Sequence, residues 1–412
     1  MFDVGLTTFM ILATSLVMLM TPGLAFFYGG LGSKKHILSI MIQSFVSLGL
    51  TTVLWFFFGY SLCFSGNMKE GTDFFGIIGN LDKAFLNGIT PKSVFSPTKN
   101  FPEYIFVAYQ MMFAIITPAL ITGAFINRIS FKGYFWFLIF WQIFVYYPFV
   151  HMVWGGGLLA VWGVLDFAGG IVVHATAGFA ALASVYFVGA RKEKKHTPNN
   201  IPLVAVGTAL LWFGWYGFNA GSEMAVNDIT VAAFLNTDIA ASFAAITWLI
   251  IEWNTARKKP TFIGLMTGAV AGLATITPAA GYVTIQSAAL IGIIAGGGCY
   301  LAVKFKENKQ GDDALDVWGV HGMGGIIGTI CVGLFATTTI NPGATDGIFY
   351  GGSILFLLKQ LAAILVAVVY SFFFTLFLLK GINYLVPVKA SPSEQKEGLD
   401  ISYHGEIARD VS

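Results

Sequence analysis

Long apolar segments recur along the whole chain, and short polar segments separate them. Each apolar segment is roughly 18 to 25 residues long, the length that an α-helix needs to cross a bilayer. The short alternating segments typical of a membrane β-barrel do not form the pattern. We therefore predict an all-α polytopic membrane protein with eleven spans. They cover approximately residues 5–29, 37–61, 103–126, 134–152, 166–189, 201–220, 230–252, 261–280, 284–303, 315–338 and 350–385.

Composition agrees with this fold class and excludes others. Only 11% of the residues are charged, less than half the share in a typical soluble domain, and 56% are hydrophobic. The net charge of +2 provides no basic surface for a nucleic acid. The three cysteines lie in apolar runs, so we interpret them as buried hydrophobic residues. We expect no cofactor, no bound metal and no enzyme activity, because the chain has no nucleophile–base pair, metal cluster or cofactor motif.

Lysine and arginine are distributed unequally between the loops. Fourteen lie in the odd-numbered loops, and four lie in the even-numbered loops, all within residues 65–102. Cytoplasmic loops carry an excess of these residues, so we predict that the odd loops are cytoplasmic. The N-terminus would then be outside, and the tail 386–412 would be inside. We expect the protein in the cytoplasmic membrane of a prokaryote.

Two lone histidines inside apolar spans are the main indication of what the protein moves. His174 follows Asp166 in span 5, and His321 follows Asp316 in span 10. An ionisable side chain in a membrane span is a functional-site hypothesis by default. Two neutral imidazoles in a line could hydrogen-bond a small neutral polar solute, since each has one donor and one acceptor. The alternative is a pair of structural histidines whose hydrogen bonds are satisfied within the protein.

An internal repeat relates the two halves of the membrane domain. AIITPA (114–119) in span 3 recurs as ATITPA (274–279) in span 8, and the Asp and His of span 5 correspond to Asp316 and His321. The three offsets, 160, 150 and 147, are similar. Spans five apart run in opposite directions, so the repeats 5–189 and 201–338 would be inverted, with a long eleventh helix outside them. Such repeats place the substrate pathway at their interface.

Aromatic residues gather near the outer ends of the spans. Trp154 stands beside three glycines after span 4, Phe113 lies in span 3, and Phe218 and Ser222 end span 6. The face of a tryptophan attracts a desolvated cation by up to ~2 kcal/mol. These residues would meet in an outer vestibule that recruits a cation. The alternative is an aromatic belt at the membrane interface.

Several long motifs resemble the Amt/Mep/Rh ammonium transporter family, and more specifically its Amt branch. They are YQMMFAIITPALITGAFINR (109–128), HMVWGGGLLA (151–160), LDFAGGIVVHATAG (165–178), GWYGFNAGS (214–222) and DVWGVHGMGGIIG (316–328). The resemblance covers essentially the whole chain, from TPGLAFFYGGL (21–31) to GLDISYHGE (398–406). It implies eleven helices, a homotrimer and one pore in each subunit.

The resemblance also implies roles for particular residues. Trp154, Phe113 and Ser222 correspond to the family's external ammonium recruitment site, and Phe113 and Phe218 to the stacked gate below it. The family's twin pore histidines correspond to the two histidines named above. Asp166 corresponds to the acidic residue below the recruitment site. Its competing role is structural, as a cap that holds backbone amides at the start of span 5.

We therefore expect a protein that takes up ammonium. Ammonium and potassium have similar size and charge, but only ammonium can lose a proton and cross an apolar pore as ammonia. The proton would follow separately. Two alternatives stay open: an ammonium sensor with little flux, and a passive channel for ammonia gas. Methylammonium would be a further substrate.

The tail 386–412 has a polar composition that by itself suggests disorder. The resemblance implies instead that GLDISYHGE packs on the cytoplasmic face and couples neighbouring subunits. It also implies a PII-type (GlnK-like) signalling protein as a partner on that face, to which the basic loop 190–196 could contribute. The default interpretation of that loop is a solvated cytoplasmic loop.

Overall fold

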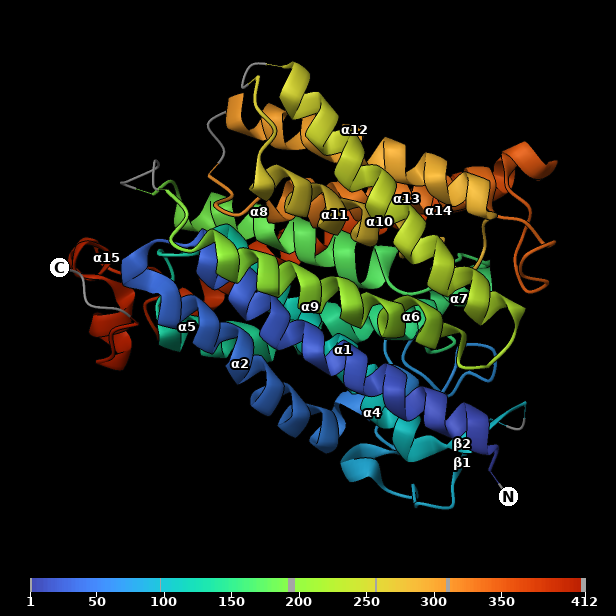
Figure 1. Ribbon diagram of the computed structural model, residues 1–412. Helices are drawn as coiled ribbons and strands as arrows, with labels where there is room; N and C mark the ends of the chain where they lie inside the picture. The colour runs from blue at the N-terminus through green and yellow to red at the C-terminus, as the bar shows by residue number, and fades with distance from the viewer. Residues whose placement is uncertain (1, 97, 192–196, 256–257, 309–311, 409–412) are drawn as a thin grey trace.

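The computed structural model describes residues 2–96, 98–191, 197–255, 258–308 and 312–408. Long helices form one bundle, and the two termini lie at its opposite ends (Figure 1). We call these ends the N-side and the C-side. Most of the predicted basic loop 190–196, and the basic residues counted at 257 and 309, lie outside the described residues.

The helices follow the predicted spans in order. The first half contains α1 (Val4–Leu31), α2 (Ile37–Leu54), α3 (Tyr60–Phe64), α4 (Glu103–Ile121), α5 (Phe131–Trp141), α6 (Tyr147–Trp154), α7 (Leu158–Trp162) and α8 (Thr176–Val188). The second half contains α9 (Ile201–Ala220), α10 (Asp228–Asn254), α11 (Phe262–Ile276), α12 (Ile285–Asn308), α13 (Met323–Phe335), α14 (Ile354–Leu385) and α15 (Pro392–Glu397). A hairpin of β1 (Val94–Ser96) and β2 (Lys99–Pro102) lies on the N-side.

Ten helices in the described ranges are long and apolar enough to cross a membrane. The multi-pass prediction is therefore confirmed. The exception among the eleven predicted spans is α11, which has 15 residues and reaches only ~22 Å at ~1.5 Å per residue. It ends just before Pro278, which has no N–H to continue a helix. That α11 crosses the bilayer stays a prediction, although termini at opposite ends require an odd number of crossings.

The first helices of the two predicted repeats, α1 and α9, pack closely along each other. A β-carbon at Gly207 would lie 2.3 Å from the backbone nitrogen of Phe27, and one at Gly214 would lie 2.2 Å from Cγ of Met20. Small residues permit this approach of two backbones. The glycines of α9 therefore fix the contact between the two halves.

Two aspartates hold the starts of spans 5 and 10 in the same manner. The carboxylate of Asp166 accepts hydrogen bonds from four successive amides, Gly169–Val172, at 2.7 to 3.1 Å. The carboxylate of Asp313 accepts from Val317 at 3.1 Å and Trp318 at 2.8 Å. Each bond satisfies an amide that has no partner within its own helix.

The predicted correspondence between Asp316 and Asp166 is therefore wrong. The carboxylate of Asp316 forms an ion pair with Lys306, whereas the carboxylate of Asp313 accepts the span-10 amides and performs the capping. Asp313 stands 147 positions after Asp166, the same offset that separates the two histidines. The inverted repeat stays a prediction, with Asp313 in place of Asp316 as the counterpart of Asp166.

The described part of the tail packs against the start of α2, so the disorder that its composition suggested is not found there. The carboxylate of Asp400 accepts hydrogen bonds from the amides of Leu38 (3.1 Å) and Ser39 (2.8 Å). The amide of Leu399 donates to Nδ1 of His36 at 3.1 Å. The tail thereby supplies the N-terminal cap that α2 lacks in its own loop.

Candidate functional site

The two predicted pore histidines meet inside the bundle. His174 lies on the π-helical segment Gly170–Ala175, and His321 on the π-helical segment Trp318–Gly322. Their Nδ1 atoms are 3.3 Å apart, and their rings are 20° from parallel. Short π-helical segments are rare and often occur at functional sites. A hydrogen bond between two facing Nδ1 atoms needs one donor and one acceptor, so the two imidazoles carry their protons on different nitrogens.

Both histidines border a small apolar cavity. Its volume of about 10 Å³ is close to the minimum for one water molecule. The other lining residues are Met20, Leu24, Phe27, Ile116, Leu120, Val173, Leu211, Trp215, Phe218 and Val270. Nε2 of His174 is buried and has no hydrogen-bond partner among the described residues. The described lining thus offers the imidazole groups of His174 and His321 to a small polar molecule and contains no charged side chain that could compensate a full positive charge.

Glycines bring the two histidine-bearing spans together. A β-carbon at Gly178 would lie 2.1 Å from Cα of Gly322, the residue after His321. A β-carbon at Gly325 would lie 3.0 Å from Cβ of His174. Larger residues at these positions would separate the imidazoles, so this backbone contact sets their distance.

Two phenyl rings lie on the N-side of the histidines. The ring centroids of Phe113 and Phe218 are 4.2 Å apart, and the ring of Phe218 is 6.1 Å from His174. Both phenyl rings are 1% exposed. The four rings from Phe113 to His321 therefore form a continuous stack that is closed to solvent at its N-side end.

A larger cavity, the N-side vestibule, lies beyond this stack. Its volume is about 490 Å³. Its lining comprises Phe64, Phe95, Ser96, Lys99, Phe106, Gln110, Phe113, Val153, Trp154, Asp166, Phe167, Ser222, Glu223, Met224, Tyr282 and Asn341. The vestibule therefore brings together Trp154, Phe113, Ser222 and Asp166, which the sequence placed there, and Phe218 lies directly behind Phe113.

Trp154 and Ser222 are held in orientation by backbone groups. The indole N–H of Trp154 donates to the carbonyl of Asp166 at 2.9 Å, and its ring stands edge-to-face with Phe113 at 5.9 Å. The hydroxyl of Ser222 donates to the carbonyl of Phe218 at 2.8 Å. That bond leaves oxygen lone pairs on Ser222 for a cation. The four amides bound to Asp166 leave its carboxylate little capacity to bind a cation directly.

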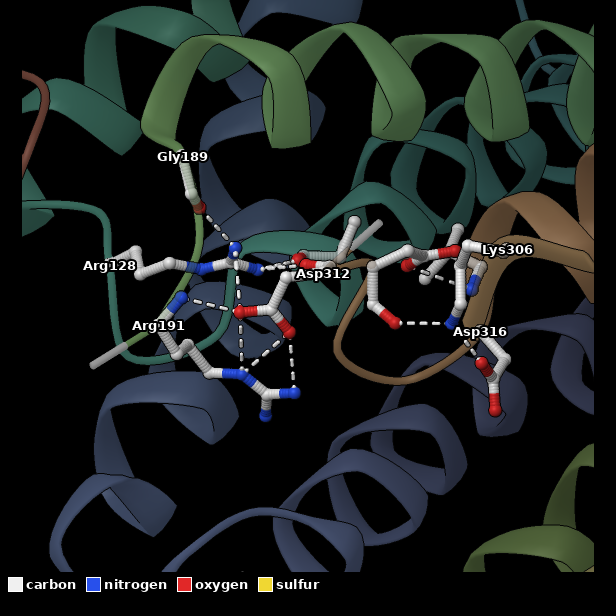
Figure 2. Close-up of polar contacts among 9 residues, drawn as sticks. Arg128, Gly189, Arg191, Lys306, Asp312 and Asp316 are labelled. Carbon is white, nitrogen blue, oxygen red and sulfur yellow. Dashed lines mark hydrogen bonds and ion pairs between the residues drawn. The ribbon is translucent and has the colours of Figure 1, made fainter. Parts of the chain in front are cut away.

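On the C-side, Asp312 joins three loops through two arginines (Figure 2). Arg191 binds its carboxylate at 2.7 Å, and Arg128 lies 3.5 Å from it. Arg128 also donates to the carbonyl of Gly189 at 2.6 Å. Burial acts to raise the pKa of Asp312, but the hydrogen bonds from Arg191 and the charge of Arg128 outweigh it and lower that pKa. Burial lowers the pKa of Arg128 to about 10, so it stays charged at neutral pH.

A second large cavity, the C-side vestibule, lies between the ion pair of Arg191 with Asp312 and His321. It has a volume of about 910 Å³, and its lining includes Asp313, Asp316 and Lys306. The ammonium group of Lys306 donates to the carbonyl of Asp313 at 2.7 Å and pairs with Asp316. Two vestibules thus approach the paired histidines from opposite ends, and apolar side chains close the path between them.

Comparison with known proteins agrees with this arrangement. Residues 8–409 match the model of the Ammonium Transporter Family. The chain is 42% identical over 407 residues to ammonium transporter Amt1 of Archaeoglobus fulgidus, covering 98% of this chain and 99% of that protein. It is 42% identical over 412 residues to the ammonium transporter of Bacillus subtilis, with 98% of each chain covered.

The chain belongs to the ammonium transporter family. Among solved structures it resembles Saccharomyces cerevisiae Mep2, with a TM-score of 0.85 and 34% identity over 95% of this chain and 88% of that one. It also resembles a structure described as Sensor Amt Protein, with a TM-score of 0.87 and 30% identity over 97% and 98%. The family consists of transporters, which confirms the prediction that the chain is not an enzyme.

Sequence patterns indicated no role for three residues that contact the ring stack or the N-side vestibule. Trp215 stacks on His174 at 5.6 Å. The hydroxyl of Tyr109 lies 3.2 Å from Oγ of Ser222. Glu223 lines the vestibule directly after Ser222. The position of Glu223 next to a proposed recruitment residue was the one available signal, because the other two contacts depend on how separate helices pack.

Proposed function

We propose that this ammonium transporter family member recruits ammonium in the N-side vestibule and conducts it inward as ammonia. The support is the placement of Trp154, Phe113 and Ser222 around one cavity. The two rings offer π-faces and edges, and Ser222 offers an acceptor oxygen. A cation in a partly desolvated aromatic site gains up to ~2 kcal/mol from a tryptophan face. Such a site binds ammonium and potassium alike, so selection must occur further inward.

The closed ring stack is the observation that carries the proposal. Phe113 and Phe218 must move apart for any solute to pass, and the cavity beyond them is apolar. A charge at the centre of a bilayer costs at least ~2.5 kcal/mol. Ammonium avoids that cost when it leaves a proton on the N-side, whereas potassium cannot. We propose that the proton is lost near the gate formed by Phe113 and Phe218.

His174 and His321 then guide ammonia and provide a route for the proton. Ammonia has a lone pair and three N–H groups, which match the donor and acceptor of a neutral imidazole. The free Nε2 of His174 is one such contact. The Nδ1 pair at 3.3 Å is close enough to pass a proton between the rings. Net movement of ammonia and a proton would amount to ammonium uptake.

Currents on solid-supported membranes that carry the purified protein test this proposal. Pulses of ammonium and methylammonium should give current, and potassium should not. His174→Ala should lose that selectivity, and His404→Ala, in the tail, serves as the matched control. A pH change in the vesicles without current would indicate the passive ammonia channel instead.

A sensor that binds ammonium with little flux is the second candidate. The similarity to the solved Sensor Amt Protein, at 30% identity, is the observation that favours it. Saturable binding of ammonium without current or vesicle pH change would decide for the sensor. Both candidates use the same vestibule, so only flux separates them.

We further propose that the N-side faces outward, that the chain assembles as a homotrimer in the cytoplasmic membrane, and that its C-side binds a PII-type signalling protein. The docking of Asp400 on α2 supports a regulatory tail, because it links the tail to the first C-side loop. Deleting residues 391–412 should alter transport or its regulation. Loss of the trimer on native gels after that deletion would contradict this role.

A further inference from the structure

A lysine enters the cavity in which we place cation recruitment. Lys99 begins β2, and its side chain lines the N-side vestibule with Trp154 and Ser222. Its ammonium group donates a hydrogen bond to the carbonyl of Glu223 and lies 3.7 Å from Oε1 of the same residue. A positive charge thus occupies the wall of a site that we propose for another positive charge.

The hairpin that carries Lys99 is firmly anchored. Phe101 is completely buried, and Phe95 stacks on Phe106 with 3.7 Å between ring centroids. The amide of Asp3 donates to the carbonyl of Asn100 at 3.0 Å. The backbone at Lys99 is therefore fixed, whereas its four-carbon side chain can rotate. Because the ion pair is partly exposed, it contributes little to stability, and the side chain can leave it without unfolding the hairpin.

Glu223 provides the acceptors that a primary ammonium ion needs. It follows Ser222 in a short 3₁₀ turn, and its carboxylate also accepts a hydrogen bond from the side-chain Nδ2 of Asn227 at 3.1 Å. The side-chain ammonium of Lys99 is itself a primary alkylammonium, with the same charge and the same N–H donors as methylammonium. Its position beside Glu223 therefore indicates where such an ion binds.

The charge balance of the vestibule depends on this one lysine. The charged residues among the lining residues of the described cavity are Lys99, Asp166 and Glu223. Asp166 is occupied by four backbone amides, so Glu223 is the carboxylate that remains to attract a cation. A cleft lined by charge of one sign raises the local concentration of the opposite ion. Without Lys99, every monovalent cation would accumulate next to Ser222.

We propose that Lys99 is a tethered competitor for monovalent cations at Glu223, and that the Glu223 carbonyl and carboxylate form an outer binding station for ammonium and alkylammonium ions. This inference rests on the proposed recruitment of ammonium in the same vestibule. While Lys99 occupies the station, its charge lowers the concentration of all monovalent cations, potassium included, at the recruitment residues. An incoming ammonium ion replaces the lysine and then moves one residue inward to Ser222.

Substitution of Lys99 by the neutral, equally long methionine tests the idea. Ammonium currents are measured on solid-supported membranes at low ionic strength, with increasing potassium as competitor. We expect Lys99→Met to lower the half-saturating ammonium concentration by about threefold or more and to increase inhibition by potassium similarly. Lys92→Met, which removes the same charge from an exposed position of the same loop outside the vestibule lining, is the matched control.

Glu223→Gln provides an independent and opposite test. It leaves the charge of Lys99 uncompensated, so the half-saturating ammonium concentration should rise. The double variant Lys99→Met/Glu223→Gln should return close to the wild-type value. Added salt should reduce all of these shifts because it screens exposed charges. Unchanged ammonium saturation and potassium inhibition in both folded single variants would overturn the inference. Absence of ammonium current in the wild type would instead overturn the proposed function.

Discussion

Replacement of Asp166 by asparagine should destabilise the protein strongly. The carboxylate oxygens each accept two of the four amides of Gly169–Val172, and Asp166 is 5% exposed. Asparagine keeps one acceptor oxygen and turns an NH₂ group toward the other two amides. A buried donor left without an acceptor costs ~1–3 kcal/mol, so two of them cost roughly 2 to 6 kcal/mol.

Asp313, which caps span 10, provides a second measurement of the cost of an unpaired amide. It accepts two amides, one on each oxygen, and is 2% exposed. Asp313→Asn therefore leaves one donor without an acceptor and should cost roughly 1 to 3 kcal/mol. Asp82→Asn, on an exposed N-side loop, is the control for removal of a carboxylate. Thermal unfolding in a single detergent at neutral pH should give the order control, Asp313→Asn, Asp166→Asn, from highest to lowest midpoint.

The same variants separate the two roles considered for Asp166. If Asp166 acts as a cap, loss of transport in Asp166→Asn will accompany loss of thermal stability. A variant that melts with the wild type but carries no ammonium current would refute this reasoning. It would show that the carboxylate acts on the cation and not through the backbone of span 5.

Three further predictions follow from contacts elsewhere in the bundle. Gly178→Ala should destabilise the protein far more than Gly322→Ala. A β-carbon at Gly178 would lie 2.1 Å from Cα of Gly322, whereas a β-carbon at Gly322 would lie 3.2 Å from Cα of Gly178. Thermal unfolding of the two variants in detergent compares their stabilities. Asp400→Ala should expose the tail to trypsin and lower the melting temperature less than Asp166→Asn does, because the amides of Leu38 and Ser39 that lose their acceptor can bind water once the tail is released. Folding lowers the pKa of Asp312. The ionised carboxylate therefore stabilises the folded state fully above its unfolded pKa of ~3.9, and this contribution is lost as the pH falls through the folded pKa. The melting difference between wild type and Asp312→Asn should therefore be full at pH 7 and shrink below about pH 4.

Sequence patterns predicted the multi-pass helical fold, because it depends on local composition, and the structure brings the candidate site residues together, although their roles stay predictions. A membrane span requires a long apolar run, and an intramembrane histidine is conspicuous within one. The error over Asp316 has a specific origin. The letters LDV before His321 resemble LDF before His174, which favoured Asp316 as the partner of Asp166. Capping depends instead on distance along the chain, and Asp313 precedes its histidine by eight residues, as Asp166 does.

Other features depend on tertiary structure and left no clear trace in the sequence. The hairpin around Lys99 lies in a long loop whose polar composition resembles that of any exposed segment. Its lysine reaches Glu223 across a sequence separation of 124 residues, and no periodicity reports such a contact. The close approach of Gly178 and Gly322, where two backbones touch, likewise joins residues far apart in the sequence. Glycine there is visible in the sequence, but its partner is not.

The capping residues Asp166 and Asp313 and the two vestibules explain why the proposed pore is symmetric at its centre and asymmetric at its ends. Asp166 and Asp313 each cap a span eight residues before its histidine, and the two imidazoles meet with 3.3 Å between their Nδ1 atoms. The ends then differ in the groups that face solvent. The N-side vestibule offers aromatic faces beside the partly exposed Lys99–Glu223 pair, whereas on the C-side Asp312 is held by Arg191 and Asp316 by Lys306. We infer that cations gather on the N-side because the aromatic faces and the carboxylate of Glu223 act on a cation together there.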